Sequence, residues 1–242
     1  MIKIDNIKNF TTSFLSLISK TSESVCIKVD SNKIYSVTSS GDNTIVVFST
    51  YKQQNDLQDN LKLNIPDINR LNRLLNCVNE NNIELDHDSN CIKYKSKTVR
   101  FKYHLLEDGI ITVPAVSIDK IKKLSFDYNF NISKSCVLSL IKGSSLMTDA
   151  DKLYFYVQDN SVYAEITDKE TQNTDSYTQL VCENFGDETF KQMSINFEIL
   201  RILSSLRFEN VCVRINTDVN VLLFEVEIEN IKHNFICTTY VR

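Results

Sequence analysis

The sequence is poor in the residues and motifs that mark several common protein classes. Its 242 residues include four glycines, two prolines and no tryptophan, and no apolar run approaches the ~20 residues that a membrane-spanning helix needs. It contains no Gly-rich phosphate loop, no Gly-x-Ser-x-Gly and no His-Glu-x-x-His, which are motifs of common nucleotide, esterase and metallopeptidase sites. We therefore expect a protein that is not an enzyme, binds no cofactor and has no membrane partner.

The cysteines and histidines are too dispersed for a metal site or a disulfide framework. The seven cysteines are scattered singly without Cys-x-x-Cys spacing, which favours small buried side chains in a reducing compartment. The isolated His87, His104 and His233 lack metal-ligand spacing, and we place Asp86-His87-Asp88 in a solvated turn between strands.

Because Met1–Asp5 lacks the layout of a signal peptide, we expect a cytoplasmic protein, in the host cytoplasm if it is viral.

The chain consists of two weakly similar halves, each with the order strand, helix, strands, helix, strands. Helices are predicted from apolar positions three and four apart, strands from alternation, and turns from Asp and Asn between β-rich runs. In the first half the predicted elements are Met1–Asp5, Asn6–Lys20, Val25–Val29, Lys33–Val37, Thr44–Tyr51, a helix with Pro66 in its first turn, Cys91–Lys95 and Val99–His104. In the second half they are Phe126–Asn131, Ser133–Ser144, Leu153–Val157, Ser161–Ile166, Tyr177–Cys182, Asn196–Arg207, Val219–Ile228 and Phe235–Tyr240.

This duplication predicts an α+β chain with two modules, 1–105 and 125–242, joined by a connector at 106–124. Leu15-Ser16-Leu17-Ile18 reappears as Leu138-Ser139-Leu140-Ile141. The spacing between matched positions grows from 123 at Leu17/Leu140 to 132 at Leu71/Leu203, as small loop insertions would produce. Within the connector, residues 110–113 are also compatible with one more strand.

The four predicted helices reverse the charge balance of the chain. The whole chain has 27 Lys and Arg against 31 Asp and Glu, a net charge of −4. The helices contain only the acids Asp67 and Glu198, against eight basic residues: Lys8, Lys20, Arg70, Arg73, Lys134, Lys142, Arg201 and Arg207. A basic bias on one helix would be explained by an ordinary solvent-exposed face. The same bias on four helices in duplicated positions favours a shared basic surface that binds a polyanion. No base-reading motif occurs, so the predicted contact is sequence-independent.

Two copies of this module, with Lys and Arg on the helices and acids elsewhere, resemble the sliding clamps of DNA replication. The best-matching stretches are Leu153–Ile166 and Phe235–Arg242. Two modules per chain resemble the bacteriophage clamps and the eukaryotic and archaeal clamp, proliferating cell nuclear antigen. The resemblance implies a homotrimeric ring of six modules, with helices lining the hole around double-stranded DNA and antiparallel sheets outside. It also implies two protein partners, the DNA polymerase that the ring tethers for processivity and a clamp loader.

The resemblance implies two further sites. Subunits would join by pairing of edge strands, and the expected interface residues are Val99, Phe101, Tyr103, Tyr177, Gln179 and Val181. Partner peptides would dock in an apolar pocket beside the connector and the C-terminus, near Val113, Pro114, Tyr240 and Val241. Ordinary core or linker packing is the alternative explanation for these four residues.

Two other functions are compatible with parts of the pattern. An open monomeric or dimeric polymerase accessory factor would hold DNA by electrostatics alone, and it would need a more basic chain than this one. A β-rich viral structural protein would not account for the charge reversal on all four helices. The abundance of Asn, Lys and Ile is expected from an AT-rich genome, and we expect a virus because the two-module trimer is found in bacteriophages.

Overall fold

The computed structural model describes residues 1–55, 60–88, 90–116, 121, 123–147, 150–171, 174–186 and 188–239. By their contacts the residues form two compact units. Unit 1 comprises Met1–Gly41, Val46–Val116 and Glu227–His233, and unit 2 comprises Asp42–Ile45, Ser117–Val226 and Asn234–Arg242. The module boundaries at 105 and 125 stay predictions, and unit 1 includes a short segment from near the C-terminal end.

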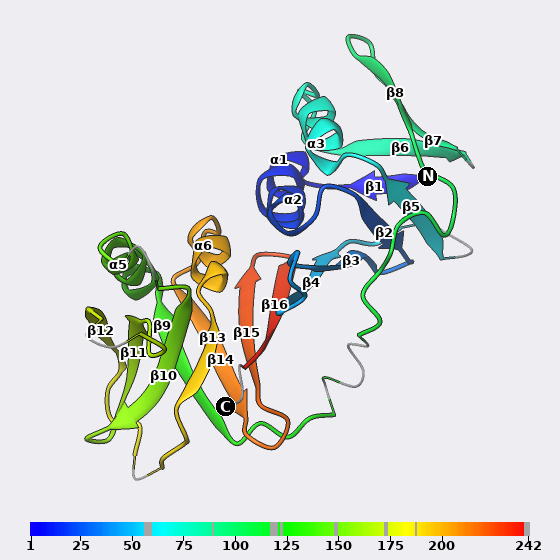
Figure 1. Ribbon diagram of the computed structural model, residues 1–242. Helices are drawn as coiled ribbons and strands as arrows, with labels where there is room; N and C mark the ends of the chain where they lie inside the picture. Colours follow the sequence, from blue (N-terminus) through cyan, green and yellow to red (C-terminus); the bar gives the residue numbers. More distant parts are fainter. Residues whose placement is uncertain are drawn as a thin grey trace. The chain divides into compact units, whose positions relative to one another are not determined.

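The described residues of the first half form eight strands and two helical regions (Figure 1). Its elements are β1 (Ile2–Ile4), α1 (Ile7–Asn9), the π-helical segment η1 (Phe10–Leu15), α2 (Ser16–Thr21), β2 (Val25–Val29), β3 (Lys33–Ser39), β4 (Ile45–Lys52), β5 (Leu61–Ile65), α3 (Ile68–Asn76), β6 (Ile83–Asp88), β7 (Cys91–Lys95) and β8 (Arg100–His104). No helix or strand forms at residues 110–113.

The second half repeats this order of elements. They are β9 (Tyr128–Ser133), α5 (Lys134–Ser144), β10 (Lys152–Gln158), β11 (Ser161–Thr167), β12 (Ser176–Cys182), β13 (Met193–Asn196), α6 (Glu198–Ser204), β14 (Asn210–Asn216), β15 (Val221–Ile228) and β16 (Ile231–Thr238). Among the described residues, no helix has both the length and the apolar character needed to span a bilayer.

The hydrogen-bonded order of the strands is also the same in the two halves. In the first half the orders are β1-β6-β7-β8 and β5-β2-β3-β4, and in the second half they are β9-β14-β15-β16 and β13-β10-β11-β12. Pairs such as β1–β6, β2–β3 and β10–β11 are antiparallel. The repeated order and pairing confirm the predicted α+β duplication.

The two predicted hairpins form because their turns carry suitable side chains. In the first, the Asp30 carboxylate accepts hydrogen bonds from the backbone N–H groups of Asn32 and Lys33, both at 2.9 Å. In the second, Asp159 and Asn160 have φ values of 49° and 56°, which Asp and Asn tolerate better than most residues and which a two-residue hairpin turn requires. Strands β2/β3 and β10/β11 therefore match their predicted positions closely.

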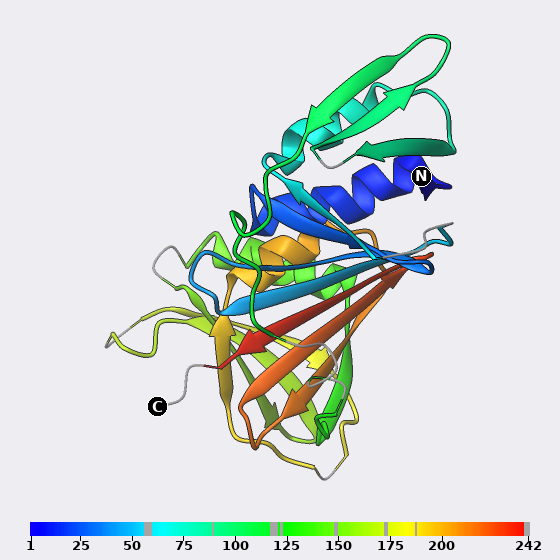
Figure 2. The same ribbon diagram turned by 90° about the vertical axis from the view of Figure 1, so that its right-hand side faces the viewer.

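The N-terminal helix is amphipathic and runs as one helical stretch through α1, η1 and α2 (Figure 2). It begins where the Asn6 side chain accepts a hydrogen bond from the backbone N–H of Asn9 at 2.9 Å, an N-cap interaction. It ends at Ser22, which is extended with φ −155° and ψ 141°. The predicted helix is confirmed, whereas its π-helical centre has no signal in the residue pattern.

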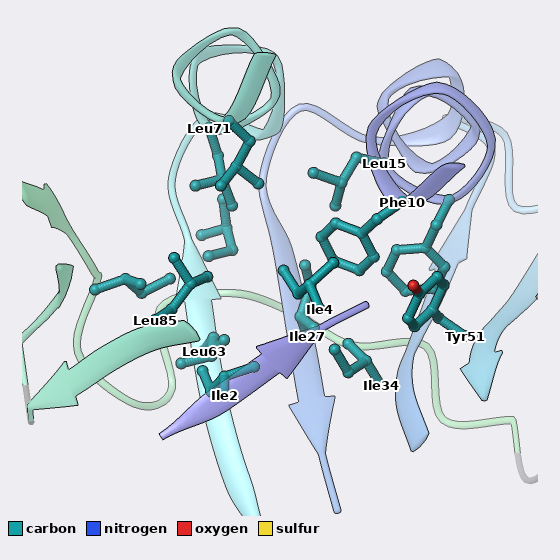
Figure 3. Packing of buried hydrophobic residues seen from close by; sticks show 14 of the residues in the cluster. Ile2, Ile4, Phe10, Leu15, Ile27, Ile34, Tyr51, Leu63, Leu71 and Leu85 are labelled. Carbon is teal, nitrogen blue, oxygen red and sulfur yellow. The ribbon is translucent and has the colours of Figure 1, made fainter. Parts of the chain in front are cut away.

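The core of unit 1 lies between this helix, α3 and the strands. Phe10 stacks on Phe14 with ring centroids 5.1 Å apart, and Tyr51 of β4 meets Phe10 edge-on at 5.1 Å. Figure 3 shows Phe10 and Leu15 pointing from the helix toward Ile4 and Tyr51. Full burial of such a side chain contributes about 1.5–3 kcal/mol, so one face of each helix is fixed against the strands.

Strands β5, β6, β13 and β14 were not predicted from the sequence, and the turn predicted at Asp86-His87-Asp88 is wrong. These three residues end β6 instead of forming a turn. In β6 the buried Ile83 and Leu85 alternate with exposed acids, and the low strand propensity of Asp and Glu hides the alternation.

Two predicted helix boundaries were also wrong. Pro66 is not in the first turn, because Asp67 is the N-cap and its carboxylate accepts from the Arg70 N–H at 2.8 Å. The last helix is shorter than predicted, since Asn196 ends β13 and the helix occupies only Glu198–Ser204.

The segment 227–233 joins unit 1 through hydrogen bonds to the first helix and to β4. The side-chain amide of Asn9 donates to Glu229 Oε2 at 2.9 Å and to Asn230 Oδ1 at 3.2 Å. The backbone N–H of Lys52 donates to the Asn230 carbonyl at 2.8 Å. A turn from the second half of the sequence thus completes the first unit.

His233 is fully buried in the same part of unit 1. Its Nδ1 lies 2.9 Å from Ser49 Oγ. Desolvation lowers the pKa of His233 to about 3, although a hydrogen bond with the backbone of Ser13 opposes the shift. The imidazole is therefore neutral in the folded protein at neutral pH.

We predict that His233 makes the protein acid-sensitive. Between pH 6.5 and about 3 the unfolded chain binds a proton at this residue and the folded chain does not, so stability falls as pH falls. From pH 7 to pH 5 the wild type should lose about 2 kcal/mol more unfolding free energy than His233→Gln. Urea unfolding of both proteins at the two pH values measures this, and equal losses would contradict it.

Candidate nucleic-acid interface and docking surfaces

The first helical stretch presents a polar face that contains two of the predicted basic residues. Lys8, Thr12 and Lys20 are exposed at steps of four and eight residues, while Phe14 and Ile18 are buried. Residues four apart lie on one face of a helix, so burial of the apolar stripe directs the two ammonium groups outward.

Helix α3 presents its basic residues in the same way. Arg70 and Arg73 are exposed and Leu71 is buried. The start of the helix is fixed to β8, because the Tyr103 hydroxyl donates to the Asp67 carbonyl at 2.6 Å and accepts from the Asp67 N–H at 3.1 Å. In Figure 1, α3 lies beside the first helical stretch on one side of the strands of unit 1.

In unit 2, Lys142, Arg201 and Arg207 are exposed, and α5 packs beside α6 (Figure 1). Arg201 forms an ion pair with Glu198 at 3.1 Å. Arg207 lies beyond the end of α6, not within the helix. Three of the predicted basic residues are thus accessible on the helix side of unit 2.

Lys134, the fourth predicted basic residue of unit 2, has a different environment. Its ammonium donates to the backbone carbonyls of Leu203, Ser204 and Leu206 at 3.2, 2.7 and 2.6 Å. It also lies 4.7 Å from the centroid of the Phe208 ring, and desolvation lowers its pKa. These carbonyls belong to the end of α6, where a cation is favoured by the helix dipole. We therefore assign Lys134 to the C-cap of α6 instead of to a ligand surface.

We predict that Lys134 contributes to stability. Lys134→Met should lower the free energy of unfolding by about 1–3 kcal/mol, because three carbonyls lose a charged donor. The matched control is Lys142→Met on the exposed face of the same helix, with an expected change within about 0.5 kcal/mol. Chemical denaturation measures both, and equal effects would contradict the assignment.

The two strands predicted to form subunit edges each have one neighbour within the described residues, β7 for β8 and β11 for β12. On β8, Val99 precedes the strand and is half-buried, as is Phe101, which packs against Tyr94 with ring centroids 5.5 Å apart. Tyr103 is buried, so only its main chain is available at the edge.

On β12, Tyr177 and Gln179 point toward α5, and Val181 is half-buried. Ser139 Oγ donates to Gln179 Oε1 at 3.0 Å and lies 2.8 Å from the Tyr177 hydroxyl. The Tyr177 ring occupies the space where a Cβ on Gly143 would stand. No local residue pattern indicates the role of Gly143, because that role depends on a strand more than thirty residues away.

We predict that Gly143→Ala is destabilising, although alanine normally stabilises a helix by about 1 kcal/mol over glycine. The new methyl group would overlap the Tyr177 ring, and overpacking of this kind costs about 1–3 kcal/mol. Gly41→Ala is the control, since no atom lies within 4 Å of its Cβ position. A rise in the unfolding free energy of Gly143→Ala would contradict the prediction.

Two of the four residues predicted for the peptide pocket lie within the described residues. Val113 and Pro114 are half-buried and line a hollow of about 50 Å³ in unit 1. The other lining residues come from the segment between α2 and β2, from β2 and β3, and from the connector: Ser22, Ser24, Val25, Cys26, Val37, Thr38, Ser39, Ile111 and Thr112. Tyr240 and Val241 lie outside the described residues.

A larger hollow of about 490 Å³ in unit 1 was not predicted. Its lining is mostly polar and comprises Asn60, Lys62, Asn64, His87, Asn90, Leu105, Leu106, Glu107 and Asp108. Desolvation lowers the pKa of His87, so its imidazole is neutral at neutral pH. Within the described ranges, no group of three or more His, Cys, Asp and Glu residues could hold a metal ion.

Comparison with solved structures shows the same fold over the whole chain. The proliferating cell nuclear antigen of A. fulgidus, bound to the C-terminal region of FEN-1, matches with a TM-score of 0.75 and 13% identity over 100% of this chain and 99% of that one. Those of Entamoeba histolytica and Thermococcus kodakaraensis match with TM-scores of 0.72 and 0.73, at 15% and 12% identity. They cover 99% of this chain and 98% and 99% of their own.

No protein-family model and no curated protein sequence matches the chain. At 12–15% identity the structural likeness establishes the fold. The predicted clamp fold is thereby confirmed.

Proposed function

We propose that this protein is a sliding clamp that encircles double-stranded DNA and tethers a DNA polymerase, giving it processivity without catalysis of its own. The observation that carries the proposal is the clamp fold over 99–100% of the chain. The basic residues on the solvent side of the helices support it, because a surface that contacts phosphates needs clustered Lys and Arg.

The proposed DNA-facing residues are those that the helices leave exposed. They are Lys8, Lys20, Arg70, Arg73, Lys142, Arg201 and Arg207. Such residues contact the phosphate backbone without reading the sequence. The net charge of −4 suits a ring, which retains DNA by encircling it and does not depend on strong electrostatic affinity.

The proposed assembly is a homotrimer joined through β8 and β12. Each of these strands has one hydrogen-bonded neighbour within the described residues, β7 for β8 and β11 for β12. Pairing of these two edges between neighbouring copies would join Val99 and Phe101 to Tyr177, Gln179 and Val181 and close six modules into a ring.

The polymerase and the clamp loader are proposed to dock through short peptides. In one matching structure, the C-terminal region of FEN-1 is bound to A. fulgidus proliferating cell nuclear antigen. Val113 and Pro114 lie against β2 and β3, and we propose that they form the peptide site together with Tyr240 and Val241.

Solution mass and topological retention on DNA test this function together. Light scattering should give three times the chain mass of 27.9 kDa. The protein should thread over the free end of a bead-tethered duplex, stay through a high-salt wash once that end is blocked, and leave when the duplex is cut. Arg70→Glu with Arg73→Glu should keep the mass but thread less efficiently, because the new charges repel phosphates.

A strict monomer at all concentrations would overturn the ring. Binding to open and blocked duplexes that salt removes equally would then favour the open accessory factor, which holds DNA by electrostatics alone.

A further inference from the structure

The end of the β7–β8 hairpin that carries the turn is strongly basic. Residues 91–104 contain five Lys and Arg and no Asp or Glu, although the chain as a whole is acidic. Figure 1 shows this end extending beyond β1 and β6, the other strands of its sheet. It contains four exposed cations, which we call the basic hairpin end: Lys95, Lys97, Arg100 and Lys102.

These four cations are not neutralised by the residues around them. In the β7–β8 ladder Lys95 lies directly opposite Arg100, and like charges in such a pair destabilise a sheet. Within the part of the chain that the structure describes, none of the four forms an ion pair. Lys93 differs, because it lies opposite Asp86 of β6 and pairs with the Asp88 carboxylate at 2.6 Å. The excess positive charge is therefore at the hairpin end.

The hairpin holds the cations on a preformed surface. In the turn, Ser96 Oγ accepts hydrogen bonds from the N–H groups of Thr98 and Val99 at 3.3 and 3.1 Å, and the Ser96 N–H donates to the Val99 carbonyl at 2.8 Å. On the other face, the rings of Tyr94 and Phe101 lie 5.5 Å apart and pack with the core of unit 1. Because side chains alternate between the two faces of a strand, the cations of both strands point away from that core and from the helices packed on it.

The chemistry of this surface distinguishes between possible partners. Between residues 95 and 102 the exposed side chains are the four cations and Thr98. Protein partners are held mainly by apolar and aromatic anchors, and single-stranded nucleic acid stacks its bases on aromatic rings. The exposed residues of the hairpin end include neither kind of side chain. Duplex DNA presents closely spaced phosphates, which Lys and Arg alone can contact.

We propose that the basic hairpin end binds the phosphate backbone of duplex DNA, without sequence preference, at a surface separate from the helices. This goes beyond the proposed function, in which residues of the helices contact DNA inside a ring. The contact depends strongly on salt, because binding of phosphates by Lys and Arg releases counterions. It does not depend on assembly of the chain.

Covalently closed circular duplex DNA tests the proposal, because a closed protein ring cannot thread onto it without a loader. Binding to the circle therefore reports on surfaces outside the hole. Changing all four residues of the hairpin end to Gln should lower the affinity at low salt at least about tenfold. The slope of log affinity against log salt should become shallower by up to about four, one for each lost phosphate contact. Filter binding over a salt series measures both quantities.

A second variant leaves unchanged the strand edge that is proposed to join subunits. Lys95→Gln with Lys97→Gln does not alter β8, so the solution mass should stay that of the wild type while the salt slope falls by about two. Lys62→Gln with Lys191→Gln is the matched control, since it removes the same charge at exposed sites elsewhere in the chain. Its salt slope should stay within about 0.5 of the wild-type value.

Three results would overturn the proposal. The first is that both hairpin variants bind the circle as the wild type does. The second is that only Arg70→Glu with Arg73→Glu, on α3, loses affinity for the circle. The third is that Lys95→Gln with Lys97→Gln lowers the solution mass, because these residues would then serve assembly.

The proposed function is judged separately, by retention on the blocked duplex at high salt. Loss of that retention, together with hairpin-dependent binding to the circle, would reject the clamp and support the hairpin contact. Retention together with binding to the circle that is independent of the hairpin would support the clamp and reject the hairpin contact.

Discussion

The burial of one face of each helix against the strands is the constraint on which the other features depend. In the first helix, Phe10, Phe14 and Ile18 are inside the core of unit 1. Because the helix repeats every 3.6 residues, Lys8 and Lys20 must then face solvent. The same packing that stabilises the fold therefore also directs the basic side chains to the surface.

Each of the two edge strands has a tyrosine whose hydroxyl contacts a helix of the same unit. Tyr103 of β8 exchanges two hydrogen bonds with the backbone of Asp67 at the start of α3. Tyr177 of β12 lies 2.8 Å from Ser139 of α5. Each hydroxyl connects an edge to the helix layer of its own unit, so the main chain at the edge is ordered before any partner arrives. Preordered edges lose less conformational entropy on association.

Local patterns predicted much of the fold, since they require only neighbouring residues. The hairpin turn at Asp30 and a helix that begins at Ser133 could be read directly from the sequence, and the structure contains the turn and has Ser133 as the N-cap of α5. Strand β6 was missed because its exposed positions are acidic. Lys134 was assigned to the ligand surface because the four predicted helices share an excess of basic residues, but its three acceptors lie about seventy residues away in sequence.

The basic surface also shows that local patterns do not predict contacts between residues far apart in sequence. Periodicity identified which helix positions face outward, and seven of the eight predicted residues are exposed. It could not show that Gly143 accommodates the Tyr177 ring, nor that the cations of β7 and β8 share one face. These features arise from the register of strands, which a one-dimensional pattern does not specify.

The turn at Glu229 and Asn230 determines when the first unit can be finished during synthesis. Its contact with Asn9 joins residues 220 positions apart. The surface of β4 that receives His233 is also uncovered until that residue is available. A ribosome must therefore release residues 227–233 before the first unit is complete. Until then the N-terminal half exposes apolar and polar surface that the finished unit covers, and chaperones bind such surface.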